Sequence, residues 1–445
     1  MRRRLGPVVA LSFTLLAGCL LAGAASAGRR EAPAAGARKV QGVRTWAYEY
    51  LEKAHEALDQ ERYDDALAAL AQLERKDRRM NDHERSLLWQ SRAYVYSAQE
   101  QYDEAIENFR RCVDADAMPE ASLQNARYNL GQLYLVTERY DDAIRTLVAW
   151  FQHAGNPSAN AHFMMAMAYL QVDDKAQALV HARETVAGRS EPREPWLQLL
   201  ASLLIDAEEF EDAVPVLEQL SAAHPKKSYF TQLSALYSHL GKHEKALGTL
   251  EVAYLQNLLD DESNLETLAQ LYLYNDVPYK AAKVLETGLE AGRIAGDEES
   301  WRLLGTAWLQ AKERARAMPP LERAATLQRD GDGWMQLARI QLEAGDWASA
   351  RASLGRALGG GVRSPGTAQL LLGIANASEE RWEDARRAFE AAGEHPPTRA
   401  AAEQWLGSIR SYLKPDEPAA EPEGDEGAPV RQATAPTSAR RSSGS

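Results

Sequence analysis

The residues best suited to metal chemistry are three His-Glu dipeptides, His55-Glu56, His83-Glu84 and His243-Glu244. Each looks like the first half of a zinc-binding His-Glu-x-x-His motif, whose two imidazoles lie on one face of a helix. None is followed by a second histidine four residues after the first. We therefore expect solvated helix residues at these positions and no metal site.

The other candidates for catalysis are equally incomplete. Gly359-Gly360-Gly361 is not followed by Lys and then Ser or Thr, as a phosphate-binding loop would be, so we expect a turn there. Cys19 and Cys112 are the only cysteines, which excludes a disulfide framework and an iron–sulfur cluster, and we expect Cys112 to be a small core residue. The sequence predicts no enzyme and no cofactor; a hydrolase or isomerase with an unrecognised site is the alternative from another class.

The negative net charge of the chain limits the kinds of partner that it could attract. The chain has 445 residues, 51 Lys and Arg, and 64 Asp and Glu, for a formal net charge of −13. Nucleic-acid backbones and anionic lipids need a net basic surface if bulk charge is to attract them. We therefore expect no nucleic-acid partner, and contact with a membrane only through an N-terminal lipid or signal anchor.

The first 27 residues have the pattern of a secretory signal peptide. Arg2 to Arg4 precede an apolar stretch from Leu5 to Ala25, and Ala25-Ser26-Ala27 offers a cleavage site before Gly28. Within this stretch, Leu16-Ala17-Gly18-Cys19 resembles a bacterial lipobox, so lipidation of Cys19 is one alternative and an uncleaved anchor is another. We expect export to the periplasm, followed by a linker over residues 28–44.

An aromatic-x-x-Ala signature recurs through the middle of the chain. Full copies end at Ala66, Ala105, Ala143, Ala213, Ala350 and Ala385, and degenerate copies end at Ala178, Ala246, Ala281 and Ala317. Successive anchors lie 33 to 39 residues apart. A second small residue stands twelve positions before each anchor, as Gly131 does before Ala143. An apolar stripe at i, i+3, i+4 and i+7 follows the signature, which predicts pairs of helices that touch at the small residues.

This pattern resembles the tetratricopeptide repeat (TPR) family, whose repeat is about 34 residues long. The resemblance covers residues 45–413 and implies an all-α TPR α-solenoid, a right-handed superhelix of about ten helix-turn-helix repeats plus a capping helix. Pro397-Thr398 opens this last helix, which runs through Leu413 and carries Trp405. Residues 414–445 are rich in Pro, Ala and acidic residues with no aromatic residue, so we expect a disordered tail.

The resemblance also implies where a partner would bind. In TPR proteins the first helix of each pair lines a concave face, chiefly one and five residues after the consensus tryptophan. Carried onto the first half of this sequence, those positions and two neighbouring asparagines are Gln90, Tyr94, Asn125, Tyr128, Asn129, Gln132, Phe163, Met167, Gln198 and Ser202, whereas the second half offers charged residues such as Glu266 and Arg302. The set from the first half is uncharged, aromatic and rich in amides, which suits an extended peptide; the alternative is that these residues merely coat a solvated groove.

Two stretches carry a closer resemblance. Residues 225–234 (PKKSYFTQLS) and 271–286 (LYLYNDVPYKAAKVLE) look like a subgroup of exported bacterial TPR proteins that accompany TonB–ExbB–ExbD energy-transduction systems. That resemblance implies a periplasmic scaffold whose partners are TonB-, ExbB- or ExbD-type components. The alternative is a lipid-anchored envelope scaffold for outer-membrane or cell-wall assembly.

Overall fold

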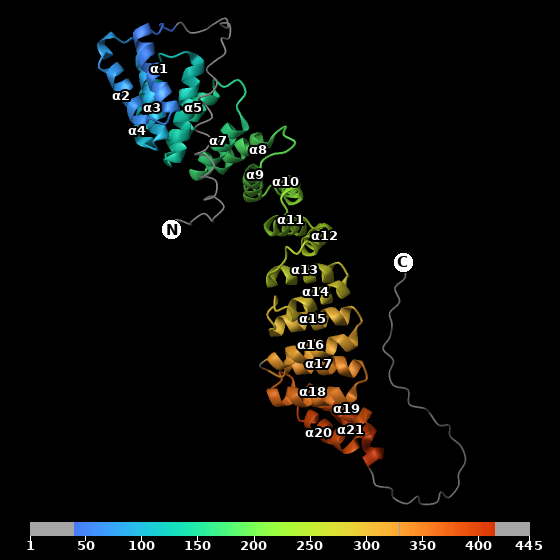
Figure 1. Ribbon diagram of the computed structural model, residues 1–445. Coiled ribbons are helices and arrows are strands. Elements are labelled where there is room, and N and C mark those ends of the chain that lie inside the picture. The colour runs from blue at the N-terminus through green and yellow to red at the C-terminus, as the bar shows by residue number, and fades with distance from the viewer. Residues whose placement is uncertain (1–39, 329, 414–445) are drawn as a thin grey trace, which may run out of the picture. The chain divides into compact units, whose positions relative to one another are not determined.

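The computed structural model describes residues 40–328 and 330–413 (Figure 1). The predicted signal peptide, Cys19, most of the linker and the predicted tail lie outside these residues. Among the described residues, none of the helices is long and apolar enough to span a bilayer.

The described residues form helices and no strands, in ten consecutive pairs followed by one more helix. The predicted all-α class and the helix-turn-helix repeats are therefore confirmed. The helices are α1 (Thr45–Asp59), α2 (Tyr63–Glu74), η3 (Asp77–Arg79), α3 (Asp82–Ala98), α4 (Tyr102–Ala115), α5 (Glu120–Val136), α6 (Tyr140–Phe151), α7 (Ala159–Gln171), α8 (Lys175–Val186), α9 (Glu194–Asp206), α10 (Phe210–Ala223), α11 (Lys227–His239), α12 (His243–Leu255), α13 (Glu262–Tyr274), α14 (Pro278–Glu290), α15 (Glu298–Gln310), α16 (Arg314–Leu327), α17 (Asp332–Glu343), α18 (Trp347–Gly360), α19 (Pro365–Ser378), α20 (Trp382–Gly393) and α21 (Arg399–Leu413).

The chain divides into two compact units, unit 1 (Met1–Asp260) and unit 2 (Asp261–Ser445). The described part of unit 1 holds α1 to α12, which are repeats 1 to 6. The described part of unit 2 holds α13 to α21, which are repeats 7 to 10 and the capping helix. In each repeat the odd-numbered helix is called the first helix and the even-numbered helix the second helix.

The aromatic-x-x-Ala signature marks the start of the second helix. Its aromatic residue is the first residue of α2, α4, α6, α10, α18 and α20, and Lys175, His243, Pro278 and Arg314 begin the remaining four. A proline costs nothing at this position, because the N–H it lacks has no partner within the helix. Each anchor alanine is completely buried, as at Ala143.

The small residue of the first helix is required by the side chain four residues after the anchor. A Cβ added at Gly131 would lie 2.6 Å from Leu147, and one at Gly373 would lie 2.4 Å from the ring of Phe389. Both distances are shorter than carbon atoms tolerate, so a Cβ at either position would force Leu147 or the ring of Phe389 to move. The pairing of small residues inferred from the sequence is therefore the contact between the helices.

Every turn between a first and a second helix contains one residue in the left-handed conformation, five positions before the anchor alanine. Gly241 and Gly345 supply it in two turns, with φ of 70° and 76°. In the other eight a residue with a side chain takes this conformation, which is less favourable for it than for glycine. Those eight residues are Glu61, Glu100, Glu138, Asp173, Glu208, Asp276, Lys312 and Glu380.

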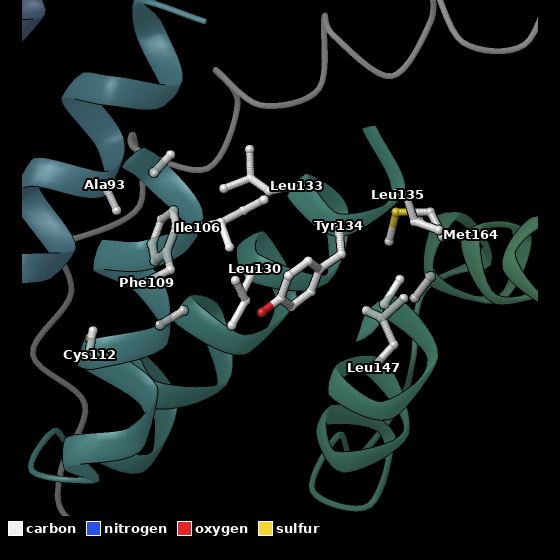
Figure 2. Close-up of a cluster of buried hydrophobic side chains, with 14 of the residues drawn as sticks. Ala93, Ile106, Phe109, Cys112, Leu130, Leu133, Tyr134, Leu135, Leu147 and Met164 are labelled. Carbon is white, nitrogen blue, oxygen red and sulfur yellow. The ribbon is translucent and has the colours of Figure 1, made fainter. Parts of the chain in front are cut away.

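The largest core cluster of unit 1 spans α3 to α7. Figure 2 shows Phe109 packed among Ala93, Ile106 and Leu130. Cys112 belongs to the same cluster, is fully buried, and its Sγ lies 3.1 Å from Sδ of Met118. Burial raises the pKa of the Cys112 thiol to about 12, so it stays protonated and acts as a small core residue, as expected.

The capping helix covers the end of unit 2 with aromatic rings. Trp405 of α21 stacks on Phe389 of α20 at 5.5 Å between centroids, and Tyr412 stacks on Trp382 at 4.3 Å. These contacts close the apolar interior of the last repeat, which is the role expected of a terminal helix.

Two local expectations are wrong. Gly359 and Gly360 belong to the last turn of α18, and only Gly361, with φ of 79°, leaves the helix, so the triple glycine is the end of a helix and not a free turn. Glu84 is not a solvated residue. It is buried because Arg44 and Asn81 supply partners for its carboxylate.

Glu84 joins the start of α1 to the start of α3. Its Oε1 accepts hydrogen bonds from the backbone N–H of Arg44 at 2.9 Å and from Nε of the same residue at 3.0 Å. Its Oε2 accepts from the N–H of Asn81, whose own side chain caps α3. The hydrogen bonds from Arg44 hold the pKa of Glu84 down at about 2.

We expect Glu84→Gln to lower the free energy of unfolding by about 1–3 kcal/mol at pH 7, because the buried acceptor loses its charge-assisted bonds. A carboxyl with a lowered pKa stabilises the fold above its ordinary pKa of 4.5, and that contribution is lost as the pH falls toward 2. The difference between variant and wild type in urea denaturation should therefore shrink in acid. Glu74→Gln, at an exposed ion pair with Arg92, is the control and should change stability by less than about 1 kcal/mol. Equal losses in both variants would contradict this role.

Candidate site on the first helices of repeats 2 to 5

The ten residues predicted to contact a partner all lie on first helices of unit 1. Gln90 and Tyr94 are on α3, four are on α5, Phe163 and Met167 are on α7, and the last two are on α9. Two pairs of first helices from neighbouring repeats contact one another, α1 with α3 and α5 with α7. No comparable contact joins two second helices within residues 40–260. In these two pairs the first helices therefore lie closer together than the second helices do.

The ten side chains differ in accessibility. Asn125 and Ser202 are exposed, and seven are half-buried. Gln132 is only 6% exposed, so it offers a partner very little surface. None of the ten is charged.

Three of the ten bind to one another. Nδ2 of Asn129 donates to the hydroxyl of Tyr94 at 3.1 Å, and the side chain of Gln90 also bonds to that hydroxyl. The ring of Tyr94 meets Phe109 edge-on at 5.3 Å. Burial raises the pKa of Tyr94. The hydrogen bonds of this group therefore join α3 to α5. Its polar atoms stabilise the fold in addition to any contact that they make with a ligand.

Gln198 belongs to a second polar group, which joins α9 to α11. Its Nε2 bonds to the hydroxyl of Tyr229, which in turn donates to Glu194. Lys226 pairs with the same carboxylate. Burial and the hydrogen bond to Glu194 raise the pKa of Tyr229 to about 12. Lys226 and Tyr229 come from the 225–234 stretch, which therefore has a structural role between two repeats.

An aromatic cluster that sequence reasoning missed joins α5, α6, α7 and α8. Tyr128 packs against Trp150 at 5.0 Å, and Trp150 meets Phe151 edge-on at 5.1 Å. Phe151 is in turn edge-on to the imidazoles of His162 and His181, at 5.0 and 5.3 Å.

The two histidines form one hydrogen-bonded pair between α7 and α8. Their Nδ1 atoms are 3.1 Å apart, so at least one ring must be neutral and accept the proton of the other. Burial, and then His162, lower the pKa of His181 to about 4, and burial also lowers that of His162. A comparison between repeats could have singled out the two histidines, because the equivalent positions of repeat 5 hold Leu197 and Val216.

The lowered pKa values of His162 and His181 predict that the free energy of unfolding of unit 1 falls in acid. A base with a lowered pKa stabilises the fold above its ordinary pKa of 6.5, and that contribution is lost as the pH falls from 6.5 to about 4. His162→Leu with His181→Val, which installs the residues of repeat 5, should therefore remove about 1–2 kcal/mol of this pH dependence, allowing for solvent at half-buried rings. Guanidinium denaturation at pH 7.5 and 4.5 measures it. His153→Gln, at an exposed position, is the matched control, and an unchanged pH profile in the double variant would contradict the prediction.

In the described parts of the chain, no three His, Cys, Asp or Glu side chains are grouped so that they could hold a metal ion.

The comparisons with known proteins follow the same repeats. The family model for the tetratricopeptide repeat matches residues 91–157, 199–258 and 335–397. No curated protein matches the chain.

Solved structures give only low overall similarity. YrrB, described as a TPR protein with an unusual peptide-binding site, is 17% identical, with 37% of this chain and 83% of that one covered and a TM-score of 0.32. A tetratricopeptide repeat protein of Parabacteroides merdae is 14% identical, with coverages of 57% and 98% and a TM-score of 0.31. The complex of the TPR2AB domain of yeast Sti1 with pHSP90 is 15% identical, with coverages of 57% and 98% and a TM-score of 0.30.

The three matched stretches fall on helix pairs whose small residues meet as the repeat requires. These three stretches therefore match the tetratricopeptide repeat in sequence and in helix pairing.

Proposed function

We propose that this chain is a non-enzymatic scaffold that binds an extended segment of a partner protein across the first helices of repeats 2 to 5. Proteins with these repeats act as scaffolds for protein–protein interaction. The observation that carries the proposal is the uncharged row on α3, α5, α7 and α9, in which seven of the ten side chains are half-buried. Partly exposed apolar and amide groups on adjacent helices can cover the side chains of an extended peptide and bond to its backbone.

The row offers two kinds of contact. Phe163 and Met167 on α7 supply half-buried apolar surface, whereas Asn125 on α5 and Ser202 on α9 are exposed polar groups. The hydroxyl of Tyr94 and the amide of Gln198 are already bonded within the protein, so they fix the spacing between repeats. We therefore assign most of the binding to α5 and α7.

We further propose that the scaffold works in the periplasm as an accessory to a TonB-type uptake system. The support is the signal-like pattern of residues 1–27 and the resemblance of residues 225–234 and 271–286 to exported TPR proteins of such systems. Crosslinking in intact cells, followed by identification of captured proteins, tests this. We expect ExbB-, ExbD- or TonB-type proteins among them, and their repeated absence would reject this assignment.

The binding surface is tested with a pair of variants in the same capture experiment. Phe163→Ala with Met167→Ala removes apolar surface from α7 and should reduce capture about tenfold. Val148→Ala with Val180→Ala removes apolar surface from the second helices α6 and α8, where these side chains are 37% and 54% exposed, and should leave capture unchanged. If a well-folded α7 variant captures as much as wild type, the partner binds elsewhere.

A lipid-anchored envelope scaffold is the second candidate, favoured by the sequence Leu16-Ala17-Gly18-Cys19. Growth with a labelled fatty acid separates the two. Labelling that disappears in Cys19→Ala supports the anchored form, and no labelling in wild type rejects it.

A further inference from the structure

The end of repeat 1 opposite its helix turn gathers basic side chains around two aromatic rings. Nζ of Lys76 lies 5.5 Å from the ring centre of Trp46 and 4.5 Å from that of Tyr50, and it donates to the Tyr50 hydroxyl at 2.9 Å. The guanidinium of Arg79 lies 5.7 Å from the Trp46 ring, and Nζ of Lys53 lies 5.9 Å from the Tyr50 ring. Arg75 and Arg78 are exposed beside them. We call Lys53, Arg75, Lys76, Arg78 and Arg79 the basic patch.

The carboxylates close to the patch are engaged elsewhere. Glu74 pairs with Arg92 at 2.6 Å and Asp77 with Arg85 at 2.7 Å. Glu84 is buried against Arg44. Glu49 and Glu52 on α1 form no ion pair with the patch either. Within the described residues, the five cations therefore have no carboxylate partner.

The local charge is the reverse of the charge on the whole chain. Four acidic residues of repeat 1, Asp59, Glu61, Asp64 and Asp65, lie at the opposite end, around the turn from α1 to α2, whereas Glu74 and Asp77 near the patch are paired with other arginines. Basic residues in the last turn of a helix complement its dipole, which accounts for Arg75 and Lys76 next to α2. Arg78 and Arg79 lie beyond α2, at the end of η3; Arg79 contacts the Trp46 ring, whereas Arg78 is exposed.

We propose that the basic patch docks on the surface of a bilayer that contains anionic phospholipid. Phosphate groups complement the five cations, and each basic side chain near such a surface adds to the attraction. Trp and Tyr are the aromatic residues that favour the headgroup level, and Trp46 and Tyr50 are half-buried beside the cations. Net charge alone argues against lipid binding, but it describes the whole surface and not this end of repeat 1.

The position of the patch in the chain supports the same partner. The apolar stretch of the sequence ends at Ala25, and the described chain starts at residue 40. Fifteen residues span at most about 50 Å, so any anchor in that stretch keeps the patch close to the membrane. The proposal does not depend on the partner bound by repeats 2 to 5.

Vesicle sedimentation of the full chain tests the proposal. Wild type should bind vesicles of 30% phosphatidylglycerol in phosphatidylcholine about tenfold more tightly than pure phosphatidylcholine vesicles at low salt, and 0.5 M NaCl should abolish the difference. Arg75→Glu with Arg78→Glu should also abolish it; neither side chain has a described contact that the change would break. Arg323→Glu with Arg410→Glu makes the same charge change in unit 2 and should retain the preference.

Three results would overturn the proposal. The first is an equal preference for anionic vesicles in the Arg75/Arg78 variant and in wild type, since binding would then come from another segment. The second is competition by millimolar inorganic phosphate at constant ionic strength, which would make the patch a site for free anions. The third is binding of an acidic peptide such as polyglutamate without any preference for anionic vesicles.

Discussion

Replacing Phe109 with alanine should lower the free energy of unfolding of unit 1 by about 3–5 kcal/mol. The side chain is 1% exposed and lies in the largest core cluster of unit 1, which draws on five consecutive helices, so the neighbouring residues cannot collapse fully into the space it leaves (Figure 2). The variant also removes the ring against which Tyr94 packs, which should loosen the hydrogen bond from Asn129. Guanidinium denaturation followed by circular dichroism measures the loss.

Leu255→Ala is the matched control for Phe109→Ala. Leu255 is also a large apolar residue of unit 1, but it is 72% exposed, and its truncation should change stability by no more than about 0.5 kcal/mol. A loss below 1 kcal/mol in the Phe109 variant would mean that the described cluster is not the core of this unit.

Replacing Ala143 with tryptophan should destabilise unit 1 by the opposite mechanism. The anchor alanine of repeat 3 is fully buried between α5 and α6, where Leu147 already fills the space over Gly131. An indole at this point must separate the two helices, which costs about 1–3 kcal/mol or more and should lower the thermal midpoint clearly.

The neighbouring residue Asp142 provides the control for Ala143→Trp. Its carboxylate pairs with Arg139 at 2.8 Å and with Arg145, both at the surface, so Asp142→Ala should change the midpoint only slightly. Similar effects of the two substitutions would contradict the register of the repeats.

The fold could be predicted from the sequence because its determinants are local and repeated. Each anchor alanine and its partner twelve residues earlier report one helix contact, and ten concordant copies fixed the register of every pair. The capping role of Trp405 followed from its place after the last repeat, and the structure confirms it by the stack on Phe389.

Features that depend on distant or exceptional contacts could not be predicted in this way. The burial of Glu84 requires Arg44, which is 40 residues away and belongs to another repeat. The left-handed turn residues are mostly acidic, and only Gly241 and Gly345 mark such a turn by a glycine. The histidine pair lies at positions that the repeat pattern does not restrict, where repeat 5 has Leu197 and Val216.

The candidate site was predicted only in part. The pattern placed all ten residues on first helices, but it did not distinguish those bonded to neighbouring repeats, such as Tyr94 and Gln198, from those available to a partner. That distinction depends on side-chain partners one repeat away. Phe163 and Met167 are consequently the residues on which the proposed recognition depends most.

Site-specific photocrosslinking in living cells tests this recognition most directly. A photoreactive residue at Met167 on α7 should yield a discrete adduct with one partner protein, whereas the same residue at Val180, 54% exposed on α8, should yield none. An adduct at Val180 together with none at Met167 would contradict the account, because the partner would then lie against the second helices.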